Sequence, residues 1–322
     1  MVNWAVLSTA RINDRLLDGV AGVDGATTLA VASRDQTRAE QYASARNIPR
    51  AYGSYEALLA DPEVDVVYIS LPNGMHVDWT RKALEAGKHV LCEKPLTRHP
   101  AEVAELFDLA ETTRLHLSEA FMYRHNPQTI KLKELVDSGA IGELRLIHSH
   151  FSFNAVASDV RLAAGLEGGG LMDVGCYPIS MFRYLAGEPE RVSAEQVVGG
   201  DGVDVVLSGV LRFSAGVLAH FDCGLAMPGR FGLEVVGSTG TLQVADPWHV
   251  GVPGIELRRE GSNEAEVIAV PKIDSYYLEA LDLTEAIAGA RAPLLGREDA
   301  IGQARALEAL YLAAETVQSV AI

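Results

Sequence analysis

Short apolar runs alternate with helical patterns along the first third of the chain, and this alternation constrains the fold more than any other feature. The strand-like runs are residues 4–7, 29–32, 64–70, 89–92 and 115–119. Strands joined through helices form βαβ units, which place the strands parallel in one sheet. We therefore predict an α/β fold whose N-terminal part is a doubly wound Rossmann domain.

The pattern changes near residues 121–126, where we place a boundary between a domain of residues 1–121 and one of residues 122–322. Long alternating runs follow at 144–153, 191–198, 203–213, 216–223 and 232–236, and helical patterns at 276–289 and 299–317 end the chain. Alternation of this kind predicts a C-terminal α+β domain with a large, mainly antiparallel open sheet. A length of 322 residues agrees with two domains.

Composition excludes several classes of function. The 27 basic and 43 acidic residues give a net charge of −16, which would repel a phosphodiester backbone, so we expect no nucleic-acid partner. No apolar run approaches the ~20 residues that span a bilayer, and no signal peptide is evident, so we expect a cytoplasmic protein without membrane attachment. The three cysteines lack the spacing of a disulfide framework or zinc site, and we expect no metal.

In doubly wound sheets, ligands bind outside the carboxyl ends of the strands. The first strand ends in Ser8-Thr9-Ala10-Arg11-Ile12-Asn13, where a phosphate-binding turn usually reads Gly-x-Gly-x-x-Gly. Small residues still let the backbone approach a pyrophosphate at the helix N-terminus, so the candidate cofactor contacts here are Ser8, Thr9, Ala10, Arg11 and Ile12. An ordinary strand-to-helix connection is the alternative.

The second strand ends in Ser33-Arg34-Asp35, where nucleotide-binding folds recognise the adenosine ribose. Ser33 and Arg34 offer a hydroxyl and a guanidinium to a 2′-phosphate, and Arg38 lies on the same helix face as Arg34. These residues favour NADP as the cofactor. The alternative is a solvated loop with Asp35 as a helix cap, and Asp35 leaves NAD open.

Two further segments carry candidate chemistry. Glu93-Lys94-Pro95 follows a buried strand, and a lysine at that rim could project into a cleft, although a lone lysine is usually solvated surface. Asp173 and Tyr177 follow a run of three glycines and would share one helix face. The alternative for Tyr177 is a core aromatic ring.

Together with the Leu71-Pro72-Asn73-Gly74-Met75-His76 loop and Glu119-Ala120-Phe121-Met122-Tyr123-Arg124, these segments resemble the glucose-fructose oxidoreductase / inositol dehydrogenase (Gfo/Idh/MocA) family over nearly the whole chain. Tyr177 resembles the branch of dihydrodiol dehydrogenases, aldose 1-dehydrogenases and sugar ketoreductases. The resemblance implies cofactor contacts from Leu71, Pro72, Asn73, His76, Glu93 and Lys94. It implies substrate contacts from Lys94, Tyr123, Arg124, Asp173 and Tyr177.

The resemblance also assigns the catalytic residues. Oxidising an alcohol releases a proton as the hydride leaves, and a tyrosine with a pKa of ~10 is a poor base until a nearby ammonium lowers that pKa. Tyr177 would therefore transfer the proton, Lys94 would assist it, and Asp173 would orient a hydroxyl of a polyhydroxylated, sugar-like substrate.

Two further expectations concern the class of protein and its assembly. A non-catalytic NADP-sensing or protein-binding regulator of the same fold is the alternative to an enzyme, and the presence of both Lys94 and Tyr177 argues against it. The apolar alternation of the C-terminal sheet predicts a homodimer or homotetramer paired through that sheet.

Overall fold

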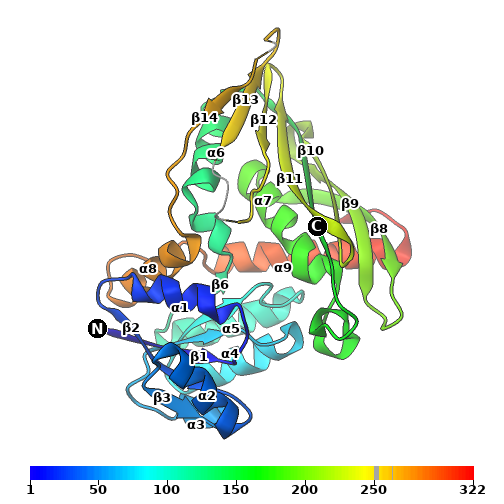
Figure 1. Ribbon diagram of the computed structural model, residues 1–322. Coiled ribbons are helices and arrows are strands. Elements are labelled where there is room, and N and C mark those ends of the chain that lie inside the picture. The colour runs from blue at the N-terminus through cyan, green and yellow to red at the C-terminus, as the bar shows by residue number, and fades with distance from the viewer. Residues whose placement is uncertain (250–253, 263) are drawn as a thin grey trace. The chain divides into compact units, whose positions relative to one another are not determined.

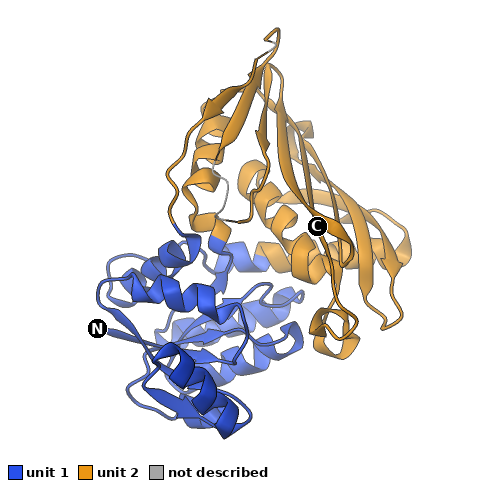
Figure 2. Ribbon diagram, in the orientation of Figure 1, with its two compact units in different colours: residues 1–122, 274–301 blue, residues 123–273, 302–322 orange. Residues whose placement is uncertain are grey.

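The computed structural model describes residues 1–249, 254–262 and 264–322, and these form two compact units (Figure 2). The first unit comprises Met1–Met122 and Asp274–Ile301, and the second comprises Tyr123–Ile273 and Gly302–Ile322. The segment Asp274–Ile301 thus packs with the first unit, whereas we expected it in the second domain.

The first unit contains a six-stranded parallel sheet of order β3-β2-β1-β4-β5-β6, which confirms the predicted doubly wound fold (Figure 1). The strand order reverses between β1 and β4, so the ends of these two strands form the switch point at which such sheets bind ligands. The strands are β1 (Val2–Leu7), β2 (Ala26–Ala32), β3 (Arg50–Tyr52), β4 (Val66–Ile69), β5 (His89–Glu93) and β6 (Leu117–Ala120).

Helix α8 explains why the late segment belongs to the first unit. The Trp4 indole N–H of β1 donates to Thr284 Oγ1 over 3.2 Å, and a Cβ at Gly19 of α1 would lie 2.7 Å from the Tyr276 backbone. α8 therefore packs directly on α1 and shares the apolar core of β1 and α2. The helices of this unit are α1 (Asn13–Ala21), α2 (Gln36–Arg46), α3 (Tyr55–Leu59), α4 (His76–Glu85), α5 (Pro100–Thr113) and α8 (Ser275–Ile287).

The second unit is built on a nine-stranded sheet of order β14-β13-β12-β11-β7-β10-β9-β8-β15. Its described pairings are antiparallel except for β7 with β10, which confirms the mainly antiparallel sheet. The strands are β7 (Leu144–Asn154), β8 (Pro189–Val198), β9 (Asp204–Phe213), β10 (Leu218–Gly224), β11 (Ala226–Gly237), β12 (Gly240–Val244), β13 (Ile255–Arg259), β14 (Glu266–Ile268) and β15 (Val320–Ala321).

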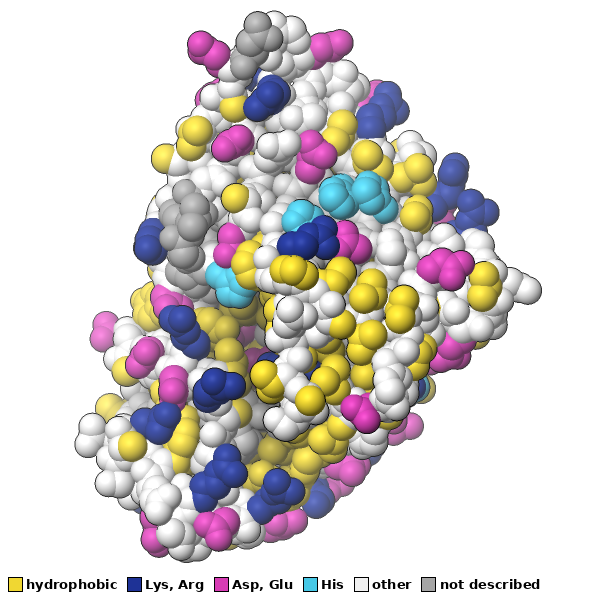
Figure 3. Space-filling view, turned by 45° about the vertical axis from the view of Figure 1, so that its right-hand side comes forward, with side chains coloured by type: hydrophobic (Ala, Val, Ile, Leu, Met, Phe, Trp, Pro, Cys, Tyr) yellow, Lys and Arg dark blue, Asp and Glu magenta, His cyan; other side chains and the backbone are white. Residues whose placement is uncertain are grey.

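Helices α6 (Pro127–Asp137), α7 (Cys176–Ala186) and the second-unit part of α9 (Arg297–Thr316) lie on one side of this sheet (Figure 1). Ile147, Ser149 and Phe151 of β7 are buried, whereas the alternate residues His148 and His150 are only half-buried. The opposite face of the sheet is therefore open within the unit, and Figure 3 shows histidine, acidic and basic side chains gathered on it beside apolar ones. None of the helices in the described ranges is long and apolar enough to cross a membrane.

Candidate functional site

The turn after β1 lacks the usual glycines, and hydrogen bonds between side chains hold it in shape. Ser8 has a φ of 150°, a backbone conformation that favours glycine. Its Oγ lies 2.7 Å from Ser70 Oγ at the end of β4 and accepts the Ala10 N–H over 3.0 Å. Asn13, fully buried, donates to the Ser8 carbonyl over 2.9 Å and accepts from Ser70 over 2.5 Å. This polar network joins the two strand ends at the switch point.

The network leaves the start of α1 suited to an anion, because no side chain caps that end. The turn itself consists of Thr9, Ala10, Arg11 and Ile12. Arg11 is exposed, and the other three are partly buried. Thr9 Oγ1 accepts a hydrogen bond from Arg38 Nε over 2.7 Å. The first turn is thereby tied to the start of α2.

Both predicted arginines are exposed, Arg34 in the loop after β2 and Arg38 in the first turn of α2. Both Arg34 and Arg38 interact electrostatically with the Tyr55 hydroxyl, so the two guanidinium groups lie on one side of the loop. Asp35 accepts the Arg38 backbone N–H over 2.7 Å and caps α2, as the alternative interpretation proposed. Ser33 is 7% exposed, and the Asp35 N–H donates to its Oγ over 3.4 Å. The residues available to a 2′-phosphate are therefore Arg34 and Arg38 more than Ser33.

His76 joins the loops that follow β4 and β5. Its ring is fully buried, with Nε2 2.8 Å from the Leu71 carbonyl and Nδ1 2.9 Å from the Pro95 carbonyl. Burial lowers the pKa of His76, while the two carbonyls act in the opposite direction. His76 thus holds Leu71 and Pro72 at one strand end against Pro95 at the next, and its own nitrogens face backbone rather than an open surface. Asn73 begins the short helix that leads into α4.

The end of β5 presents Glu93 and Lys94, which are both half-buried. Glu93 Oε1 accepts from the Tyr68 hydroxyl over 2.5 Å, and its Oε2 accepts the Lys94 backbone N–H over 3.2 Å. After Pro95, the Leu96 N–H donates to Glu119 Oε1 of β6 over 2.8 Å. Carboxylates thus fix the backbone on both sides of Lys94.

In the second unit, Asp173 lies in a π-helical turn, Leu171–Gly175, directly before α7. Its Oδ2 accepts from Arg161 Nε over 2.9 Å, and Asp173 raises the pKa of that guanidinium. The buried Asp204 carboxylate accepts the Leu171 N–H over 2.7 Å and so anchors the start of the turn. The glycine run is required here, because a Cβ at Gly169, whose φ is +127°, would lie 2.2 Å from Asp204 Oδ1.

Tyr177 is 8% exposed and its ring belongs to an aromatic cluster. Ring centroids lie 5.4 Å from Phe151, 5.6 Å from Trp248 and 5.7 Å from Tyr123. Packing of this kind orients the phenol, and it agrees both with a proton-transfer group and with a core aromatic ring. Arg124 is also buried, with its guanidinium 4.3 Å from the Tyr184 ring and 3.4 Å from Ser180 Oγ of α7.

The predicted site residues thus fall into two groups, one in each unit. The first unit brings together the residues expected at the cofactor, and the second brings together Tyr123, Asp173 and Tyr177. Sequence reasoning did not identify Asn13 and Ser70 of the turn network, nor Arg161 and Trp248 beside Asp173 and Tyr177. Ser70 is 57 residues from Asn13, and Trp248 is also far along the chain from Tyr177, so no local spacing could have revealed these two contacts.

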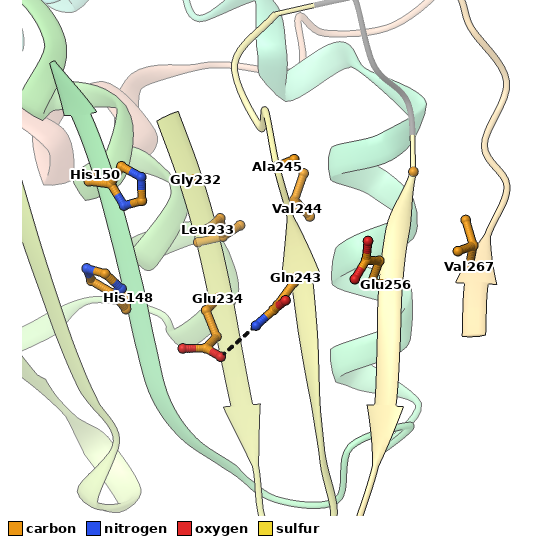
Figure 4. Close-up of a pocket in the computed structure, with 11 residues that line it drawn as sticks. His148, His150, Gly232, Leu233, Glu234, Gln243, Val244, Ala245, Glu256 and Val267 are labelled. Atoms are coloured by element: carbon orange, nitrogen blue, oxygen red, sulfur yellow. Dashed lines mark hydrogen bonds between the residues drawn. The ribbon is translucent and has the colours of Figure 1, made fainter. Parts of the chain in front are cut away.

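A groove of about 460 Å³ lies on the open face of the second unit's sheet and contains none of the predicted site residues (Figure 4). His148 and His150 of β7 point into it beside Glu234, whose Oε1 accepts from Gln243 over 3.0 Å. The remaining lining residues are Gly232, Leu233, Val244, Ala245, Gly254, Glu256 and Val267. Within the described ranges no cluster of His, Cys, Asp and Glu could hold a metal ion.

Comparison with known families assigns both units. Residues 2–121 match an oxidoreductase family with an NAD-binding Rossmann fold, and residues 129–243 match the GFO/IDH/MocA C-terminal domain. The chain therefore belongs to the Gfo/Idh/MocA family of oxidoreductases, as the resemblance of its motifs indicated.

Individual relatives span most of the chain. It is 38% identical to D-xylose 1-dehydrogenase (NADP(+)) 2 of Haloferax volcanii over 317 residues, which cover 97% of each chain. It is 34% identical to the trans-1,2-dihydrobenzene-1,2-diol dehydrogenase of Mus musculus over 77% of this chain and 75% of that one. A 3-ketoreductase from Actinomadura kijaniata, solved in complex with NADP and TDP-benzene, superposes with a TM-score of 0.91 at 30% identity over 97% of both chains.

Proposed function

We propose that the protein is an NADP-dependent oxidoreductase that moves a hydride between the nicotinamide and an alcohol or carbonyl carbon of a sugar-like or vicinal-diol substrate. The observation that carries the cofactor choice is the pair of exposed arginines, Arg34 and Arg38, at the end of β2. Arg38 also bonds Thr9 in the phosphate-binding turn, so one group joins the two cofactor-binding loops. The relatives named as NADP-dependent or solved with NADP support the same choice.

The residues of the two units have different tasks in this proposal. NADP, when bound, accepts or supplies the hydride. Lys94 and Asn73 emerge from loops that His76 holds together, which suits them to contact the cofactor and the substrate. Tyr177 transfers the proton of the reacting hydroxyl, with Lys94 favouring its phenolate form. Asp173, which is ion-paired with Arg161, accepts a hydrogen bond from a substrate hydroxyl and thereby orients the reacting carbon.

The substrate class follows from chemistry that the named relatives share. An aldose, a dihydrodiol and a keto-sugar all present neighbouring oxygens beside the carbon that exchanges the hydride. Tyr123 and Arg124 are already committed to packing against Trp248 and Tyr184, so we assign them a supporting role around the substrate.

A direct spectrophotometric assay tests the proposal. Purified protein is incubated with NADP⁺ and a panel of pentoses, hexoses and vicinal diols, and with NADPH and ketones, while nicotinamide absorbance is followed. We expect turnover with at least one panel member and a lower KM for NADP(H) than for NAD(H). Nucleotide binding by calorimetry without turnover on any panel member would instead support a non-catalytic regulator.

We also propose that two or four copies associate through the open face of the second unit's sheet. This face exposes apolar side chains, including Val197, Val210 and Leu218, whose relative exposures are 58%, 44% and 39%. A second copy covering the same patch is the simplest symmetric way to remove them from water. A cytoplasmic location stays a prediction.

A further inference from the structure

A buried polar cluster lies behind the carboxyl end of β5, within the first unit, and no step of the proposed reaction uses it. Glu279 of α8 is 2% exposed, and its Oε1 atom has no hydrogen-bond partner among the described residues. Ser275, one helical turn earlier, is fully buried, and its Oγ is likewise unpaired within the described ranges. Unpaired buried oxygens destabilise a fold, so their presence on one helix face calls for an explanation.

The groups that face Glu279 are mostly acidic or phenolic. Glu279 interacts electrostatically with Glu93 at the end of β5 and with Asp282 on its own helix. It also acts on Tyr68 of β4 and on Tyr276. Arg15 adds a positive charge and Asp274 a negative charge near Tyr276.

Of the carboxyl groups of Glu93 and Glu279, only that of Glu93 has, among the described residues, the hydrogen-bond partners that an ionised carboxylate needs. Glu93 accepts hydrogen bonds from the Tyr68 hydroxyl and from the Lys94 N–H, 2.5 and 3.2 Å away. Asp282 is paired with Arg291. Burial, followed by the charges of Glu93 and Asp282, raises the pKa of Glu279 well above its ordinary value. Two neighbouring buried carboxyl groups do not both ionise without compensation, so Glu279 keeps the proton.

We propose that Glu279 is a positioning residue that stays a neutral carboxylic acid and thereby keeps the Glu93 carboxylate on Tyr68 and on the Lys94 backbone. Those two hydrogen bonds fix the backbone that carries Lys94. The inference rests on the proposed function, in which Lys94 assists proton transfer. An ionised Glu279 would repel Glu93 and weaken both hydrogen bonds. Lys94 would then lose its fixed position, although its own side chain is unchanged.

Infrared spectroscopy tests the protonation state without any substrate. At neutral pH, the wild-type minus Glu279→Gln difference spectrum should contain the carbonyl band of a protonated carboxylic acid, which lies apart from carboxylate bands. The control Glu285→Gln removes an ion-paired glutamate of the same helix and should remove carboxylate bands instead. Loss of carboxylate bands in Glu279→Gln would overturn the proposal.

The pH dependence of kcat/KM tests the positioning role. In Glu279→Gln the alkaline loss of kcat/KM should move to higher pH, because an amide cannot ionise. In Glu279→Leu, kcat/KM should fall by about 10- to 100-fold, the effect of a slightly displaced catalytic group. In a Lys94→Ala background, Glu279→Gln should no longer move the pH profile, because Glu279 acts through Lys94.

A pH profile that is identical in wild type and Glu279→Gln would refute the positioning role while leaving the enzyme assignment intact. Absence of turnover with every substrate would refute the proposed function instead. In that case NADPH affinity as a function of pH, measured by fluorescence, replaces the rate, and the same shift between wild type and Glu279→Gln is expected. An unshifted affinity profile would again count against Glu279.

Discussion

We propose that single residues after β2 decide the choice of cofactor. Arg34 and Arg38 are exposed there, and Asp35, which could favour NAD, is occupied as the cap of α2. Two cations, Arg34 and Arg38, thus lie close to the position that often carries the acidic NAD-binding residue. The charge of the loop, rather than the shape of the turn after β1, distinguishes the two cofactors in this account.

Removing Arg34 should weaken NADP binding selectively. In Arg34→Ala, the Kd for NADP should rise about 10- to 100-fold, because a hydrogen bond to a charged group contributes ~1.5–3 kcal/mol, while the Kd for NAD should hardly change. Calorimetry with both nucleotides measures the two effects. Arg81→Ala, which removes an exposed arginine of α4, serves as the matched control. Equal affinities for NADP and NAD in the unmodified protein would contradict the cofactor assignment.

Sequence patterns predicted residues better where the chemistry is local. Ser8 could be named from its place after a strand, but its partners Asn13 and Ser70 form a network only when β1 and β4 become neighbours. His76 was expected to contact the cofactor, whereas both its ring nitrogens lie against carbonyls of the Leu71 and Pro95 loops. Such tertiary contacts leave no periodic trace in the sequence.

At the scale of elements, the short buried strands β4, β5 and β6 were predictable because each is an apolar run next to a helical pattern, whereas other short strands were not. The strands β3, β13 and β14 have only three to five residues, too few to show alternation. Asp173 and Tyr177 were expected to share one helix face, whereas Asp173 lies in a π-helical turn that is anchored by Asp204, more than 30 residues further along the chain than Leu171. Helix α8 was expected in the second domain because its contacts with α1 are distant in sequence.

The stability of the π-helical turn should depend on pH through Asp204. Burial raises its pKa to about 6, above the ordinary value of 3.8, so its contribution to stability is present below about pH 4 and is lost as pH rises through 6. The difference in free energy of unfolding between wild type and Asp204→Asn should therefore fall by up to roughly 3 kcal/mol across that range. Urea unfolding at several pH values measures it. Asp201→Asn, at an exposed neighbouring position, is the control, and a difference for Asp204→Asn that does not change with pH would contradict this role of Asp204.

At the scale of the whole molecule, three neighbouring histidines lie on the open face of the sheet. His148 stacks on His220 with ring centroids 4.3 Å apart, and His150 lies 5.6 Å from His148. Burial first, and then the neighbouring histidines or Arg230, lower the pKa of each ring, against the opposing charges of Asp222 and Glu234. The three rings are therefore neutral at pH 7, and protonating them would place like charges together on a face that we propose to be covered.

Assembly should accordingly depend on pH. Covering the face would take these rings further from water and disfavour their protonation still more, so assembly should be favoured above the ordinary histidine pKa and weaken as pH falls below it. Light scattering should therefore report dimers or tetramers at neutral pH and smaller species at acid pH. Val210→Glu on the sheet should give monomers at neutral pH, whereas Val156→Glu, exposed outside the sheet, should not. Monomers at micromolar concentration under all conditions would refute assembly, and pH-independent dimers would refute the histidine effect.

The most direct test of the central claim compares wild type with Tyr177→Phe on a substrate identified in the nicotinamide assay. The phenylalanine ring keeps the packing against Phe151 and Trp248 but lacks the proton-transferring hydroxyl. We predict that NADP binding and the free energy of unfolding are preserved while kcat falls by ~10²–10⁴, the usual contribution of a general acid or base. Lys94→Ala should also lower kcat, and the double variant should lose less than the product of the two effects. Near-normal turnover in Tyr177→Phe would contradict the account and return Tyr177 to the role of a core aromatic ring.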